Sequence, residues 1–283
     1  MKRALVMAHY DKHSIVDAHV LHTLRTYRQY FSKIIFVSVS NLASAELAKL
    51  EFLTDEVINR NNIGYDFYSW KLGISRLNVR EYDEIVISND SSYGPLTDIG
   101  SFFYKSLSID ADIWGASINK QFAPHVQSYF LSFRRGYIAS GAFSEFWNSV
   151  VPISDKMEMI LKYEVGLSSG AVQRGFKIGA IVEFGEISED TIRQVAVDND
   201  IIDVYTKRSI YSNHPLFDPI PNPVQLYWSQ AFRMGLPFLK VEVMRDNPIG
   251  NKHDFIFDRI KREKLYDVEL IRRHQSRINS DFI

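Results

Sequence analysis

Up to about residue 180, short apolar runs alternate with stretches in which apolar residues recur every three or four positions. The short runs, several of them rich in β-branched residues, indicate buried strands at residues 4–8, 34–39, 56–59, 85–87, 112–117 and 177–183. The longer stretches indicate amphipathic helices at residues 14–31, 44–52, 66–77, 97–107 and 143–150. This alternation predicts an α/β fold with a mostly parallel central sheet flanked by helices.

The remaining patterns are less regular. Residues 125–133 alternate apolar and polar side chains and predict one half-buried antiparallel strand, while residues 154–176 predict a helix with a pause at Gly166. Proline-rich loops mark residues 188–223. After them we expect a helix at 225–234, a strand at 235–243 and a mixed-charge helix at 257–278. We therefore predict one domain over residues 1–250 and a C-terminal helical extension, packed on it, over residues 251–283.

Composition and charge exclude several classes of protein. Among the 283 residues, 33 Lys and Arg nearly balance 34 Asp and Glu, so no general attraction to nucleic acid is expected. The absence of cysteine excludes disulfides and thiolate metal sites and fits a reducing compartment. The N-terminal apolar run is too short for a signal peptide, and no stretch approaches about 20 apolar residues. We expect a cytoplasmic protein.

Polar residues follow three of the predicted parallel strands. His9, Tyr10 and Asp11 follow the first, Arg60 to Asn62 follow the third, and Asn89, Asp90 and Ser91 follow the strand at 85–87. The carboxyl ends of parallel strands share one edge of a sheet, which is where open α/β sheets bind ligands. An acid such as Asp90 can hold a divalent metal that bridges phosphates. The alternative for residues 89–91 is an Asx-turn that merely closes the strand.

The loop at residues 60–64 precedes a predicted helix that Asp66 is well placed to cap. Free backbone N–H groups and the cation Arg60 suit an anionic ligand there, although Arg60 could instead pair with a surface acid. The sequence contains no glycine-rich phosphate-binding motif of the NTPase or dinucleotide type. The pairs His9 with His13 and His19 with His22 have metal-like spacing but no third ligand nearby, so no zinc site is expected.

Seven segments together carry a resemblance to a known family. They are AHYD at 8–11, RNNIGYDFYSWKLG at 60–73, NDSSYGPL at 89–96, DIWG at 112–115, HVQSYFLSF at 125–133, YEVGLS at 163–168 and GLPFLKVEVMRDNP at 235–248. With these segments, in this order, the chain resembles the rhamnan synthesis protein F family of bacterial polysaccharide glycosyltransferases. The resemblance covers about residues 4 to 250.

The resemblance implies a GT-A-type glycosyltransferase that binds a nucleotide sugar. It implies transfer of L-rhamnose or a related sugar from a dTDP donor to a polysaccharide or lipid-linked glycan, with inversion at the anomeric carbon. In that fold a strand ends in an Asp-X-Asp motif that holds metal and diphosphate. Here Asn89-Asp90-Ser91 supplies one acid instead of two, with Asp90 as the candidate ligand for Mg²⁺ or Mn²⁺.

The same resemblance assigns roles to individual residues. Glu164 is the candidate general base that inversion requires, and His125 is the second candidate. Lys240 would neutralise the diphosphate or reach the acceptor. The remaining candidates for contact with the nucleotide sugar are Tyr10, Asp11, Arg60, Asn62, Asp66, Asn89 and Ser91. The alternatives are a surface glutamate, a histidine that is only hydrogen-bonded, and a lysine that extends along the sheet edge.

Two other functions remain open from the sequence. A non-catalytic nucleotide-sugar or glycan-binding module that assists a partner transferase would also need only one acid at position 90. A carbohydrate hydrolase would need two carboxylates facing one cleft, for which Asp90 and Glu164 are the candidates, but the nucleotide-like loop at Arg60 argues against it. The mixed-charge C-terminal helix favours packing, with weak peripheral association with a membrane as a further expectation.

Overall fold

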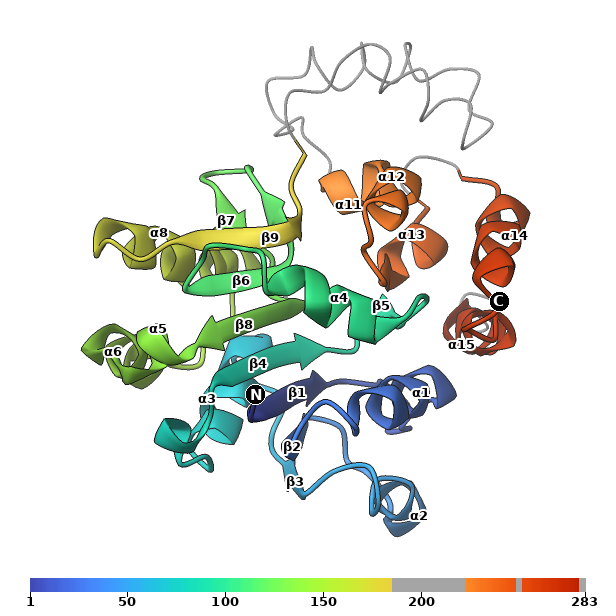
Figure 1. Cartoon of the computed structure of the whole chain (residues 1–283). Coiled ribbons are helices and arrows are strands. Elements are labelled where there is room, and N and C mark those ends of the chain that lie inside the picture. The colour runs from blue at the N-terminus through green and yellow to red at the C-terminus, as the bar shows by residue number, and fades with distance from the viewer. Residues whose placement is uncertain (185–221, 248–250, 280–283) are drawn as a thin grey trace. The chain divides into compact units, whose positions relative to one another are not determined.

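The computed structural model describes residues 1–184, 222–247 and 251–279. The chain forms two compact units, one of Met1–Asp90 with Phe103–Ile181 and one of Ser91–Phe102 with Val182–Ile283 (Figure 1). The boundary predicted at residue 250 falls within the second unit, beside residues outside the described ranges, and stays a prediction. Most of the loop predicted at 188–223 also lies outside the described residues.

An eight-stranded mixed sheet forms the centre of the first unit (Figure 1). Its strands are β1 (Arg3–His9), β2 (Lys33–Ser38), β3 (Glu56–Asn59), β4 (Glu84–Asn89), β6 (Ile113–Asn119), β7 (His125–Val126), β8 (Phe130–Arg134) and β9 (Ile178–Val182). The order is β3-β2-β1-β4-β8-β6-β7, and β9 pairs with β6. Because β3, β2, β1 and β4 pair in parallel and β8 runs antiparallel to both β4 and β6, five strands share one direction. The predicted α/β fold class is confirmed.

The centre of the sheet is buried on both faces, as expected where helices cover a parallel sheet. Val6 of β1 pairs with Ile35 of β2 and with Ile87 of β4, and all three side chains are fully buried. This explains why these strands are continuous apolar runs rather than alternating ones.

The first unit also contains helices. They are α1 (Ala18–Tyr27), α2 (Ser44–Ala48), α3 (Tyr65–Ile74), the 3-10 turn η1 (Val79–Glu81), α5 (Arg135–Ala139), α6 (Gly141–Ser149), α7 (Lys156–Met159), the π-helical segment η2 (Ile160–Val165) and α8 (Gly166–Gln173). The helix α4 (Ile99–Ser106) contains residues of both units. Helix α3 approaches the sheet closely at Gly73, where a Cβ atom would lie 2.2 Å from Cγ1 of Val6.

The described residues of the second unit are mainly helical. Among them, the short strands β5 (Ser92–Tyr93) and β10 (Leu239–Lys240) pair antiparallel, and the helices are α11 (Pro223–Leu226), α12 (Trp228–Arg233), α13 (Val241–Arg245), α14 (His253–Glu263) and α15 (Glu269–Asn279). Tyr93 is fully buried in this unit, and its hydroxyl lies 2.7 Å from Nδ1 of His274 and accepts from Nε2 of Gln275. Within the described part of the chain, every helix is too short or too polar to cross a membrane.

The single strand predicted at residues 125–133 is wrong, because the structure divides it into β7 and β8. Between them, the backbone N–H of Ser128 donates to Glu164 rather than to a neighbouring strand. The side chains of Gln127 and Tyr129 lie 2.8 Å from the hydroxyl of Ser117. The backbone N–H of Gln127 still donates to the carbonyl of Ser117, and side-chain hydrogen bonds replace the strand pairing at Ser128.

Two further predictions in the C-terminal part are corrected. The strand predicted at 235–243 is limited to Leu239–Lys240, and the chain then turns into α13, which buries Val241 and Met244 three positions apart. The helix predicted at 257–278 is two helices, because Lys264 adopts a left-handed conformation with φ of 57° and ends α14. Both errors arise where apolar spacing alone fits two structures.

Candidate functional site

The carboxyl edge of the sheet in the first unit brings the predicted strand ends together. Strands β1, β2, β3, β4 and β6 all end at this edge because they share one direction. Strand β8 begins there, since its Phe130 pairs with Ser88 near the end of β4. His125 is paired with Asn119, the last residue of β6. Asp90 and Arg60 therefore follow strands that end at the same edge.

Asp90 lies directly against the end of β1. Its Oδ2 accepts a 2.9 Å hydrogen bond from the backbone N–H of Tyr10, and the same oxygen is 4.0 Å from Nε2 of His9. His9 is buried at the end of β1, and its Nδ1 lies 3.0 Å from the hydroxyl of Ser38 at the end of β2. The side chain of Asp90 keeps 20% of its surface exposed.

Two other carboxylates belong to the same cluster. Asp66 accepts a 2.8 Å hydrogen bond from the side-chain amide of Asn89, the residue before Asp90. Burial and, next in size, the charge of Asp66 raise the pKa of Asp90 to about 8, and Asp11 acts in the same direction. The backbone N–H of Tyr10 opposes this shift but does not cancel it.

This concentration of negative charge fits a divalent cation. Oxygen ligands from carboxylates are what Mg²⁺ and Mn²⁺ prefer, and a cation would relieve the repulsion that raises the pKa of Asp90. Asp90 and Asp66 are the residues that could hold it. Asp66 thus supplies a second carboxylate beside the single acid of the Asn89-Asp90-Ser91 segment.

The structure gives Arg60 a role in shaping its own loop. Its guanidinium donates to Oγ of Ser69 at 2.7 and 3.0 Å and to the backbone carbonyls of Asn61, Ile63 and Tyr65. Burial lowers the pKa of Arg60, whereas the nearby Asp66 raises it. The alternative that Arg60 pairs with a surface acid does not match these contacts, which are with a hydroxyl and with backbone carbonyls. The guanidinium instead fixes the loop that leads into α3.

The start of α3 differs from the sequence prediction. Gly64, not Asp66, is the residue that precedes the helix, and its φ of 72° is a conformation that glycine adopts without strain. Asp66 lies within the first turn, where a carboxylate interacts favourably with the helix dipole. The capping role predicted for Asp66 is therefore wrong, although the residue does lie at the helix N-terminus.

The remaining candidates for contact with the nucleotide differ in accessibility. The ring of Tyr10 is exposed, and Asn62 is exposed on the loop before α3. Asp11 accepts from the backbone N–H of His13 at 2.8 Å and donates its own N–H to Oγ of Ser40. Asp11 thus holds the turn after β1, while Tyr10 and Asn62 present their side chains to solvent.

The two candidate bases lie near the same edge of the sheet. Oε1 of Glu164 accepts from both the backbone N–H and the hydroxyl of Ser128, each at 2.7 Å. Because Ser128 lies two residues before Phe130, which pairs with Ser88, these bonds anchor Glu164 close to the end of β4. Glu164 occupies the π-helical segment η2, and π-helical turns occur frequently at functional sites. His125 is buried, and its Nδ1 donates to the carbonyl of Ala123.

Ser91 and Lys240 belong to the second unit, where they lie together. Nζ of Lys240 donates a 3.0 Å hydrogen bond to Oγ of Ser91, next to the pairing of Lys240 with Ser92. The structure thus brings this pair together in one unit and His9, Asp66, Asn89 and Asp90 together in the other.

Sequence reasoning missed two features of this site. It placed Asp66 on the helix but not beside Asp90, although both follow strands that end at one edge. It also passed over Ser38 and Ser40, which bind His9 and Asp11 after β2. The signal in both cases was a short polar side chain just beyond a strand or at a helix start.

Comparison with known proteins identifies the family. The family model described as rhamnan synthesis protein F matches residues 34–208, well over half of the chain. The chain belongs to the rhamnan synthesis protein F family. The family expected from the seven sequence segments is thereby confirmed.

Individual relatives are more distant. The chain is similar to virulence protein VirA of Vibrio anguillarum (strain ATCC 68554 / 775), with 28% identity over 238 residues, or 80% of this chain and 75% of that protein. It is 24% identical over 197 residues to the uncharacterized protein y4gN of Sinorhizobium fredii, covering 67% of this chain and 51% of the other.

Solved structures show partial backbone likeness to this member of the rhamnan synthesis protein F family. Residues 1–349 of S. aureus TarS, in complex with UDP, align with a TM-score of 0.40 and 11% identity, over 83% of this chain and 80% of the other. A putative nucleotide-diphospho-sugar transferase from Desulfovibrio desulfuricans aligns with a TM-score of 0.40 and 9% identity, over 73% and 90%.

Proposed function

We propose that the chain is a glycosyltransferase of the GT-A type that transfers a sugar from a nucleotide donor to a growing bacterial polysaccharide. The observation that carries the proposal is the cluster of Asp90, Asp66 and Asn89 at the carboxyl edge of a mostly parallel sheet. Membership of the rhamnan synthesis protein F family supports it. Ligands bind at this edge in open α/β sheets.

The proposed donor is a nucleotide diphosphate sugar, with dTDP-L-rhamnose as the first candidate because of the family description. Asp90 and Asp66 would hold Mg²⁺ or Mn²⁺, which supplies positive charge for the departing diphosphate. Tyr10, with its ring exposed, and Asn62 are positioned to contact the nucleotide. The proposed acceptor is a polysaccharide or a lipid-linked glycan.

The proposed reaction inverts the anomeric carbon in one displacement. The acceptor hydroxyl attacks that carbon, its bond to the diphosphate oxygen breaks, and Glu164 takes the hydroxyl proton as general base. Both bonds from Ser128 use Oε1 of Glu164, so Oε2 is the oxygen assigned to the proton. His125 is the second candidate base, since Nδ1 carries its proton and Nε2 is then the basic nitrogen.

A transfer assay with dTDP-L-rhamnose and an oligosaccharide acceptor tests this function. We expect Glu164→Gln to reduce turnover by about 10²-fold or more, in line with the loss of a general base, while donor binding is retained. Glu158→Gln, on the exposed surface of α7, is the matched control and should leave turnover unchanged. Full activity of both Glu164→Gln and Asp90→Ala would contradict the proposal.

A second candidate function is a binding module that assists a partner transferase. The contacts of Arg60 favour it, because a guanidinium committed to the carbonyls of its own loop is not placed to neutralise a leaving group. Calorimetry with dTDP-L-rhamnose, paired with a donor-hydrolysis assay, separates the two functions. Binding without turnover favours the module.

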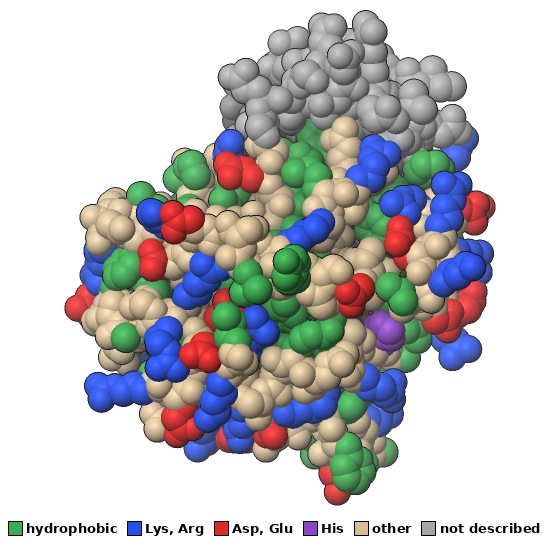
Figure 2. Space-filling view, viewed as in Figure 1, with side chains coloured by type: hydrophobic (Ala, Val, Ile, Leu, Met, Phe, Trp, Pro, Cys, Tyr) green, Lys and Arg blue, Asp and Glu red, His purple; other side chains and the backbone are tan. Residues whose placement is uncertain are grey.

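The proposed location is the cytoplasm, with peripheral association at the inner face of the membrane. Lys261, Arg262 and Lys264 are exposed at the end of α14, and the adjacent Leu265 is 53% exposed. Figure 2 shows basic side chains, interspersed with acidic ones, on the part of the surface that α14 and α15 form. An exposed leucine among cations suits an anionic membrane surface.

A further inference from the structure

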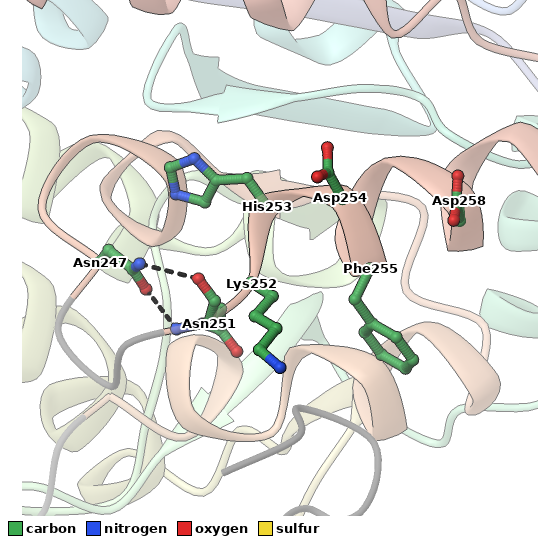
Figure 3. Close-up of a pocket in the computed structure, with 7 residues that line it drawn as sticks. All are labelled: Asn247, Asn251, Lys252, His253, Asp254, Phe255 and Asp258. Atoms are coloured by element: carbon green, nitrogen blue, oxygen red, sulfur yellow. Dashed lines mark hydrogen bonds between the residues drawn. The ribbon is translucent and has the colours of Figure 1, made fainter.

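The second unit contains an open cleft at the N-terminus of α14, separate in sequence from the Asp90 cluster. The cleft has a volume of about 600 Å³, within the range of about 300–1,000 Å³ that is common for small-molecule sites. Its walls come from Asn247, Asn251 and Lys252, which lie between α13 and α14, and from the first two turns of α14 (Figure 3). The function proposed above does not use any of its residues.

A pair of asparagines forms a rigid side of this cleft. The side-chain amide of Asn247 donates to the carbonyl of Asn251 at 2.9 Å and accepts from its N–H at 2.7 Å (Figure 3). Oδ1 of Asn251 accepts in turn from Nε1 of Trp228 at 3.1 Å. These bonds fix the Asn251 side chain before any ligand arrives, so little entropy is lost there on binding.

The other side-chain atom of Asn251 is left without a partner. Only 5% of the surface of Asn251 is exposed. Among the described residues, its Nδ2 has no hydrogen-bond acceptor. A buried donor without an acceptor is costly, by roughly 1–3 kcal/mol. Asn251 lines the cleft, while its Nδ2 is itself buried, so the residue shapes the wall of the cleft and does not meet a ligand through this atom.

The charged groups of the cleft select against an anion. Asp254 and Asp258 lie one helical turn apart and extend from the same side of α14 (Figure 3), so both carboxylates can accept hydrogen bonds from one ligand. Lys252 occupies the cap position of α14. Its ammonium group only donates hydrogen bonds, so its side chain cannot satisfy the backbone N–H groups at the helix N-terminus. Two acids and one lysine repel an anionic ligand and favour a neutral one with several hydroxyl groups.

Phe255 adds an apolar surface to these polar groups. Its ring lies against Trp228, with ring centroids 6.2 Å apart in an edge arrangement, and the partly buried residue is among those that line the cleft. The lining of the cleft thus includes an aromatic ring as well as carboxylates and amides, which match the two kinds of surface that a sugar ring presents, C–H groups and hydroxyls. The combination is the one expected for a small polar ligand held by a few fixed groups.

We infer that the cleft bounded by Asn251, Asp254, Phe255 and Asp258 binds a neutral saccharide unit of the acceptor glycan. This assignment rests on the proposed glycosyltransferase function for the identity of the saccharide as acceptor. Binding of a sugar to the cleft is itself independent of catalysis and of the donor nucleotide.

Ligand-observed saturation-transfer NMR on the full chain tests the inference. The probes are the methyl glycosides of L-rhamnose, D-glucose, D-galactose and D-mannose, without nucleotide or metal. We expect at least one to bind with a millimolar dissociation constant. Asp254→Asn combined with Asp258→Asn, and separately Phe255→Ala, should weaken this binding by about tenfold, as expected for lost hydrogen bonds to charged groups or lost ring contact.

Lys261→Ala is the matched control, because Lys261 is exposed on the same helix and does not line the cleft. It should bind the glycosides as the unaltered chain does. Asp90→Ala should also leave glycoside binding unchanged, which separates this site from failure of the proposed donor site. Absence of binding by all four glycosides at 50 mM, roughly fifty times the expected constant, would overturn the inference. Binding that survives the cleft substitutions would overturn it equally.

Discussion

The side-chain amide of Asn89 donates a 2.8 Å hydrogen bond to Oδ2 of Asp66, and this bond joins the end of β4 to the first turn of α3. It holds one carboxylate beside the next residue, Asp90, whose own carboxylate is bonded to the N–H of Tyr10. The site therefore brings carboxyl groups together before any cation is present, and its behaviour should depend on pH and on metal.

The pH dependence of stability should report the raised pKa of Asp90. The unfolded chain ionises Asp90 near pH 4, whereas burial and Asp66 raise the pKa of the folded group to about 8. The folded state thus binds more protons between these values, and stability falls as pH rises through this window. We expect Asp90→Asn to raise the free energy of unfolding at pH 8, without metal, by about 1–3 kcal/mol.

Urea unfolding at several pH values in the presence of EDTA measures this effect. The advantage of Asp90→Asn should shrink steadily below pH 8 and become small near pH 4, below which the carboxyl is protonated in both states. Asparagine keeps an oxygen that can accept from Tyr10, so the hydrogen bond is not the variable. An advantage that is equal at pH 4 and pH 8 would show that charge is not its cause.

Divalent cations should offset the loss of stability that ionisation of Asp90 causes. We expect Mn²⁺ to raise the melting temperature of the unaltered chain, because a ligand that binds only the folded state stabilises it, by about 2.7 kcal/mol at one hundred times its dissociation constant. Asp66→Asn and Asp90→Asn should each remove most of the shift. Asp110→Asn is the control, because Asp110 is a highly exposed acid paired with Lys177. A shift that all three variants share would indicate binding elsewhere.

The sequence predicted the sheet well because its central strands are buried on both faces. The run at 85–87 lies within the buried β4, and the partly exposed strand at 56–59 appears unchanged as β3. The shared edge that carries His9, Arg60 and Asp90 could also be predicted, because the carboxyl ends of parallel strands lie at the same edge of a sheet. The helix at 241–245 could not be predicted from spacing alone, since apolar residues at 239, 241 and 243 fit a strand equally well.

The contacts within the candidate site depended on tertiary structure. Nothing in the order of residues shows that Asn89 reaches Asp66 across 23 positions, or that Ser128 binds Glu164 across 36. The role of Arg60 was also hidden, because a guanidinium can pair with an acid, a ligand or carbonyls with equal chemical ease. In the structure the guanidinium of Arg60 donates to backbone carbonyls of its own loop.

Arg60 should therefore stabilise the loop before α3 through its planar fork. Arg60→Lys keeps the charge but cannot reach Ser69 and the carbonyls of Asn61 and Tyr65 together. We expect a loss of about 2–4 kcal/mol in the free energy of unfolding, with faster amide exchange confined to residues 60–69. Arg76→Lys, at an exposed 3.5 Å ion pair with Glu56, should change little. Unchanged exchange in Arg60→Lys would contradict this role.

A pair of glycines in helices of the first unit allows a test of the packing of α3 on the sheet. Gly73→Ala would place a Cβ atom 2.2 Å from Cγ1 of Val6 and 3.2 Å from Cγ2 of Val37, both on fully buried strands. Overpacking of this kind costs about 1–3 kcal/mol and should exceed the gain in helix propensity.

Gly170→Ala is the matched change, because a Cβ atom at that position of α8 would meet no heavy atom within 4 Å. It should stabilise the chain by up to about 1 kcal/mol, since alanine favours the helix over glycine. Urea midpoints of the two variants should therefore move in opposite directions. A fall in both midpoints by the same amount would mean that the loss at Gly73 does not come from contact between α3 and the sheet.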